Sequence, residues 1–354
     1  MTQRTSSGSA HRLALSLGAV LTISACAADR QSELGVEWRH ESFDSACALS
    51  QTLALSADVG RLRPLTDGRY LLIDPLRGTV QHLSESGSIL WEAGGIGSGP
   101  GEYRLPSDAT EVGDSMFAIV DPAQMRISLL DRAGHHLRSI RTTSFAGRRI
   151  LSLPGQYVLA GLNASAGGEY LLARFDTGGG SMGTTVPAPP LLRTLTPRID
   201  EAVLFRLGGT SIAVANALIP TVWLDRGAGV VAMPLRLPTD VWTQLEASDE
   251  QPKTPAEARA RVGQASMLTG GGSIDDTTIA LGWRQSQDDA APRYLAIFSL
   301  GGAPGTVLDG VPGSVIDLAG SRVWVLLPEP DTSMTVRQYQ CNWSHLQSGS
   351  DDGA

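Results

Sequence analysis

The chain repeats a short pattern at an interval of 47 residues. Ile73–Pro75 (Ile-Asp-Pro) recurs as Val120–Pro122 (Val-Asp-Pro), and Gly87 recurs as Gly134 in the same register. Asp followed by Pro favours a turn, because Asp can bond its own backbone and Pro fixes φ. An internal repeat of this length predicts several copies of one supersecondary unit packed side by side.

The second copy of the pattern predicts four antiparallel strands. The first lies within Pro106–Gly113, where apolar and polar residues mix. Ser115–Asp121 is apolar almost throughout, as in a strand buried on both faces. Arg126–Asp131 places successive side chains on opposite faces at period two, and His135–Arg141 is a short polar strand that suits an outer edge.

Four short strands in about four dozen residues are typical of one blade of a β-propeller. The composition agrees, since 40 Gly, 20 Pro and only 18% charged residues favour a turn-rich all-β domain. Six such blades would use most of the 354 residues. We therefore predict an all-β fold, a six-bladed propeller of four-stranded antiparallel blades.

Residues 60–141 resemble the NHL-type six-bladed propeller family. The resemblance rests on Gly97–Pro106 (GSGPGEYRLP), followed by Val-Asp-Pro, Arg-Ile and Leu-Asp-x-x-Gly. Weaker copies follow, and the propeller is expected to span 35–343. The last blade is one strand short, and propellers often close with strands from both chain ends, so Gly35–Phe43 is expected to complete it.

Two segments interrupt or follow the blades. Residues 239–264 break the spacing and predict a helical insertion. Thr254 and Glu257 have capping-box spacing, which predicts a helix over Pro255–Val262, and Thr239–Ala247 is a candidate second helix. Residues 344–354 are polar and rich in Gly, Ser and Asp, and are expected to be a disordered tail.

The N-terminus predicts export and a lipid anchor. Residues 1–25 carry two arginines and an apolar run at Leu13–Ile23 that is too short to span a bilayer. The run ends in Ile-Ser-Ala-Cys, which resembles a bacterial lipobox, so Cys26 is the expected lipidation site. Residues 26–34 would be a tether to the periplasmic face or cell surface. The alternative is an ordinary signal peptide cut close to Cys26, with the thiol incidental.

Cys47 and Cys341 lie near opposite ends of the mature chain. In an oxidising compartment such a pair is a disulfide candidate, and a ring fold brings its ends together. Two free buried thiols are the alternative.

Three residues are candidates for ligand binding at the mouth of the axial channel: Asp74, Asp121 and Asn216. The two aspartates end equivalent strands in two blades, where carboxylates could hold a ligand or a divalent cation. The alternatives are turn capping for the aspartates and packing for Asn216. No cofactor is predicted, and the metal, if any, is unknown.

The expected function is a binding or scaffolding module for an unidentified ligand or protein on a propeller face. Trp242, in the insertion, is a candidate partner contact, although inter-blade core is the usual role of such a residue. A formal charge of −8 implies no nucleic-acid partner. The alternative is a channel-site, metal-dependent hydrolase or lyase of the gluconolactonase or paraoxonase type, and a carbohydrate- or peptide-sensing module is a third reading.

Overall fold

The computed structural model describes residues 38–55, 60–142, 145–161, 170–188, 202–227, 229–245, 254–286, 288, 290–301, 305–328 and 334–347. They belong to one compact unit, Glu37–Ala354. The predicted signal peptide, the lipidated Cys26 and the tether lie outside the described residues. No helix in the described part of the chain has the length and apolar character needed to cross a membrane.

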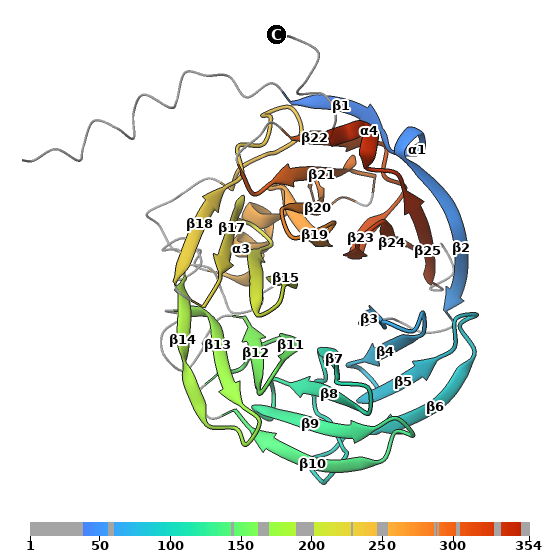
Figure 1. The fold of residues 1–354 in the computed structure, drawn as a ribbon, viewed down its shortest axis with the longest axis vertical. Helices are drawn as coiled ribbons and strands as arrows, with labels where there is room; N and C mark the ends of the chain where they lie inside the picture. The colour runs from blue at the N-terminus through green and yellow to red at the C-terminus, as the bar shows by residue number, and fades with distance from the viewer. Residues whose placement is uncertain are drawn as a thin grey trace, which may run out of the picture. The chain divides into compact units, whose positions relative to one another are not determined.

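The strands form six sheets arranged in a ring (Figure 1). Blade one consists of β3 (Arg61–Pro64), β4 (Tyr70–Asp74), β5 (Thr79–Leu83) and β6 (Ile89–Gly94). Blade two consists of β7 (Asp108–Val112), β8 (Met116–Asp121), β9 (Arg126–Asp131) and β10 (His136–Arg141). Blade three consists of β11 (Arg149–Leu153), β12 (Gln156–Ala160), β13 (Tyr170–Asp176) and β14 (Ser181–Pro187). Blade four consists of β15 (Ala202–Gly208), β16 (Ser211–Asn216), β17 (Thr221–Asp225) and β18 (Val230–Pro234). Blade five consists of β19 (Met267–Ser273), β20 (Thr278–Arg284), β21 (Arg293–Ser299) and β22 (Thr306–Asp309). Blade six consists of β23 (Ser314–Ala319), β24 (Arg322–Pro328) and β25 (Met334–Cys341), joined by β2 (Cys47–Leu55).

Neighbouring blades bury one another, which explains the apolar sequence of the second strands. On β4, Leu71 packs in a cluster with Phe117 of blade two. The next residue, Leu72, packs with Trp324 of blade six. Successive side chains of a strand point to opposite faces, so each blade contributes to two cores.

The ring is closed by its inner strands. Each of β3, β7, β11, β15 and β19 contacts the first strand of the next blade, and β23 contacts β3. The predicted six-bladed propeller of four-stranded antiparallel blades, completed by an N-terminal strand, is therefore confirmed.

The segment that completes the last blade differs from the prediction. Of Gly35–Phe43, residues Arg39–Ser42 form β1, which pairs parallel to β22 at the outer edge of blade five. Blade six is completed by β2, which pairs antiparallel to β25. The sequence of β2 did not predict this pairing, because most side chains of an outer strand are exposed and need not be apolar. The short helix α1 (Phe43–Ala46) joins the two strands, with Phe43 buried against Tyr339.

The structures of the insertion and of the tail agree only in part with what the sequence predicts. Helix α3 (Pro255–Gly263) has the expected capping box, since the Thr254 hydroxyl accepts from Glu257 N and the Glu257 carboxylate accepts from Thr254 N. Residues 239–245 form turns and irregular structure, not a second helix. The start of the expected disordered tail is a helix, α4 (Ser344–Gln347), because Leu346 is buried in the core of blades five and six.

Candidate functional site

The first strands of the blades begin at one end of the ring, which we call the Arg61 end. Arg61, Asp108 and Arg149 open β3, β7 and β11, and pair with residues at the closing ends of β4, β8 and β12. Asp74, Asp121 and Asn216 close β4, β8 and β16. The predicted channel-mouth residues therefore share this end with three charged residues that the sequence did not single out.

Asp74 and Asp121 are occupied by backbone donors. Asp74 Oδ1 accepts from the N–H groups of Leu76 and Arg77, both at 2.9 Å. Asp121 accepts from Arg104 N at 2.7 Å and from backbone and side-chain N–H of Gln124. Asp74 thus holds a turn of its own blade, and Asp121 holds both the turn after β8 and the end of the loop that precedes β7.

Asn216 caps a turn in the same way, because its Oδ1 accepts from Leu218 N at 2.9 Å. Its Nδ2 is buried and has no hydrogen-bond partner in the described part of the chain. Among the described residues, no three or more His, Cys, Asp or Glu side chains gather as metal ligands would. The hydrogen bonds of Asp74, Asp121 and Asn216 show turn capping, and ligand binding by these residues stays a prediction.

An axial charge cluster lies at the same end, formed by Arg61, Arg63, Asp108, Arg149 and Asp317. Arg63 is its centre. Its Nη2 lies 2.8 Å from Asp108 Oδ2 in blade two, and its Nη1 lies 3.0 Å from Asp317 Oδ2 in blade six. Its Nε donates to Ala109 O at 3.1 Å. Its Nη2 also donates to Ile150 O of blade three at 3.5 Å, so one side chain joins blade one to blades two, three and six.

Asp108 is fully buried and carries the opposite charge. Besides Arg63, it accepts from Ile150 N of blade three at 3.1 Å. Burial alone would raise the pKa of Asp108, but Arg63, Arg61 and Arg149 outweigh burial and hold this pKa below its ordinary value. The carboxylate is therefore ionised at neutral pH and serves as a fixed counter-charge.

Arg61 is the least satisfied member of the cluster. Its Nε lies 3.5 Å from Asp108 Oδ1, a distance and geometry that make an ion pair without a hydrogen bond. Burial, and then the nearby charge of Arg149, lower the pKa of Arg61 to about 10. Arg149 is itself held in place, since its Nε donates to Ala202 O at 3.0 Å and its Nη1 to Arg148 O at 3.4 Å.

The glycine-rich segment 95–104 forms a braced loop between blades one and two. Arg126 Nη1 donates to Gly99 O at 3.2 Å, Gln124 Nε2 donates to Gly97 O at 3.3 Å, and Gly99 N donates to the Glu102 carboxylate at 2.7 Å. The chain enters the loop through Gly94, at φ +105°, where a Cβ would lie 2.6 Å from a backbone oxygen. These contacts hold the loop in place.

Exposed apolar side chains stand on this loop and on two turns that are hydrogen-bonded to it. Ile96 is 72% exposed, and Leu76, in the adjacent β4–β5 turn, is 70% exposed. Met125 is 44% exposed in the β8–β9 turn, at a φ of +46° that residues other than Gly rarely adopt. We refer to Leu76, Ile96 and Met125 as the apolar trio.

Trp242 is not a surface contact. Its side chain is only 6% exposed and its ring lies 6.2 Å from that of Trp283, within the core of blades four and five. The prediction of a partner contact at Trp242 is therefore wrong. The insertion folds back because its tryptophan fills the inter-blade core.

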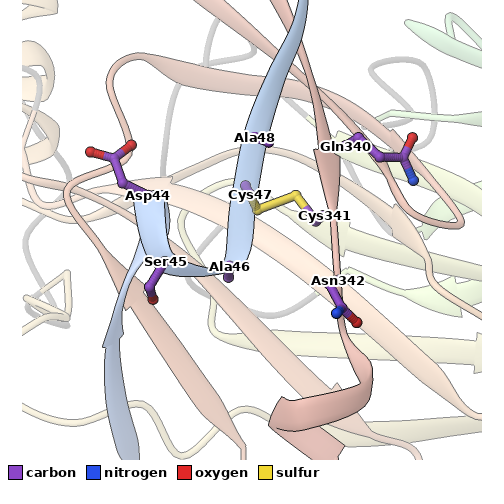
Figure 2. Close-up of a pocket in the computed structure, with 8 residues that line it drawn as sticks. All are labelled: Asp44, Ser45, Ala46, Cys47, Ala48, Gln340, Cys341 and Asn342. Carbon is purple, nitrogen blue, oxygen red and sulfur yellow. A yellow bond between two sulfur atoms is a disulfide. The ribbon is translucent and has the colours of Figure 1, made fainter.

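Cys47 and Cys341 form a disulfide. The two residues are direct partners in the β2–β25 register, so the bond reinforces the strand pair that closes blade six. Figure 2 shows the disulfide between these strands, in a surface pocket of about 440 Å³ flanked by Asp44 and Asn342. The predicted pairing is confirmed.

The sequence matches no protein-family model and no curated protein. The fold is similar to that of a protein from Bacteroides fragilis named as an exported protein, with a TM-score of 0.59 and 13% identity over 86% of this chain and 99% of that one. A DUF4221 family member from Bacteroides vulgatus gives 0.58 and 8%, over 84% and 98%. Virginiamycin B lyase from Staphylococcus aureus gives 0.47 and 10%, over 79% and 80%, a likeness too weak for a functional argument. Such identities show a shared fold alone.

Proposed function

We propose that this protein is an exported, lipid-anchored propeller that binds a protein or ligand at the Arg61 end of its ring. Export is supported by the N-terminal charge, the apolar run and the lipobox pattern before Cys26. It is also supported by the similarity to a protein named as exported. Kinship with NHL-type propellers, which rests on the motifs of residues 60–141, is part of this proposal.

The apolar trio is the observation that carries the binding role. Exposed apolar groups that gather on a surface mark interaction sites in soluble proteins. Ile96 stands on a loop already braced by Gln124, Arg126 and Glu102. A preformed loop loses little conformational entropy on binding, so its exposed side chain is suited to a partner.

Site-specific photo-crosslinking tests the binding role. A photo-reactive amino acid replaces Ile96, and in a matched control it replaces Leu137, which is 51% exposed on the outer strand of blade two. Irradiation of intact cells is expected to give a discrete adduct from position 96 and none from position 137. Equal adducts from both positions, or none from either, would contradict the proposal.

A further inference from the structure

The axial charge cluster contains three arginines and two aspartates. Both acids are engaged by Arg63, and Asp108 also accepts from a backbone N–H. The cluster therefore has a surplus of one positive charge. We assign this surplus to the arginine with the fewest hydrogen bonds.

That place is Arg61. A guanidinium offers five N–H donors, yet Arg61 makes no hydrogen bond with the described residues and has only the 3.5 Å ion pair to Asp108. Its side chain is 12% exposed, so the group is largely removed from water but still open to a small ion. A buried charged donor without partners is costly, and a matching acceptor would relieve that cost.

Arg149 supplies a second cationic group near Arg61, because the next residue, Ile150, donates its N–H to Asp108, the carboxylate that pairs with Arg61. Its Nε and Nη1 are fixed by backbone carbonyls, which leaves Nη2 with no partner among the described residues. The repulsion between the two guanidinium groups contributes to the low pKa of Arg61. An anion between them would turn this repulsion into attraction.

We propose that Arg61 and Arg149 bind an oxyanion, a carboxylate or phosphate group, at the Arg61 end of the ring. The planar fork of a guanidinium matches the two oxygens of such a group. Asp108 positions Arg61 and limits the surplus to about one charge, which favours a small or singly charged group. The inference deepens the proposed function, on which it rests, by naming the chemistry recognised at the binding end.

Phosphate binding to the purified full chain tests this inference. Sodium phosphate is titrated against sodium chloride of equal ionic strength, with heat of binding and thermal unfolding as readouts. The wild-type chain is expected to show saturable binding and a rise in Tm with phosphate but not with chloride. Arg61→Gln is expected to weaken phosphate binding by about tenfold or more, since hydrogen bonds to a charged group are lost.

Arg69→Gln is the matched control. It removes the same charge from an exposed arginine in the β3–β4 turn, at the opposite end of β3, and should leave phosphate binding unchanged. The Arg61 side chain makes no hydrogen bond with the described residues, and its backbone pairing in β3 survives the change, so Arg61→Gln should fold. Equal effects of phosphate and chloride, or unchanged binding in Arg61→Gln, would overturn the oxyanion site. If the oxyanion site is overturned but photo-crosslinking gives a discrete adduct at position 96, the proposed function stands. If phosphate binds as expected but position 96 gives no adduct, the proposed function alone is contradicted.

Discussion

The guanidinium group of Arg63 connects blade one to blades two, three and six, and it depends on Asp108 to do so. Asp108→Asn removes the buried counter-charge of Arg63 and Arg61, and is expected to lower the free energy of unfolding by about 3–5 kcal/mol. Urea unfolding at neutral pH measures this loss. Asp114→Asn, an exposed change in the β7–β8 turn, is the control and should cost little. Equal stability of the two variants would show that the axial pairs do not hold the blades.

The same carboxylate gives a pH dependence. The pKa of Asp108 in the folded chain lies below its ordinary 3.8. A lowered carboxylate pKa means that the unfolded state takes up the proton first, so this contribution is complete above pH 3.8 and is lost as pH falls further. The stability difference between wild type and Asp108→Asn should therefore shrink below that pH, and a constant difference down to the lowest accessible pH would contradict the assignment.

At this scale the sequence revealed turn residues better than axial ones. Asp74 and Asp121 stood out because Asp-Pro repeats, and their alternative role as turn caps is the one the hydrogen bonds support. Arg61 and Asp108 also occupy equivalent repeat positions, and that pairing of opposite charges was a readable signal. Their interaction could not be predicted, because it forms between blades and depends on how inner strands approach across the ring.

Among the elements, β2 and β25 decide how the chain closes. Their register places Cys47 opposite Cys341, and the disulfide fixes it (Figure 2). Reduction is expected to lower the free energy of unfolding by about 5 kcal/mol, because a cross-link over a sequence separation of 294 residues restricts the unfolded chain. Urea unfolding with and without reductant measures the change. A chain with both cysteines changed to Ala should ignore reductant, and a wild type that also ignores it would contradict the role of the bond.

The elements also show where sequence patterns fail. Gly35–Phe43 alternates, yet its described part, β1, pairs on the edge of blade five. β2 alternates poorly, yet it completes blade six, since its partner is supplied from the far end of the chain. The period-two pattern predicts strands that have one buried face, but it does not predict the outermost strands, which are mostly exposed. Helix α3 was predictable because a capping box is a local signal.

At the scale of the whole unit, six weakly similar copies form a ring with chemically distinct ends. The repeat predicts the number of blades and the order of their strands, because every copy buries its apolar faces against the neighbouring blades in the same way. What differs between copies, such as Arg61 in blade one and Asp108 at the equivalent position of blade two, sets the character of the Arg61 end. Function in a propeller therefore depends on departures from the repeat, which periodicity does not reveal.

Central to the proposed function is that the ring is exported and held at a membrane through Cys26. Fractionation of cells that express wild-type protein or Cys26→Ser tests this most directly, with Asp114→Asn, an exposed change that keeps the lipidation site and the disulfide, as the control. Wild type and Asp114→Asn are predicted to sediment with membranes, and Cys26→Ser to appear in the soluble envelope fraction, because the acyl chains provide the membrane affinity. A Cys26→Ser chain that still sediments with membranes, or a wild-type chain that does not, would contradict the claim.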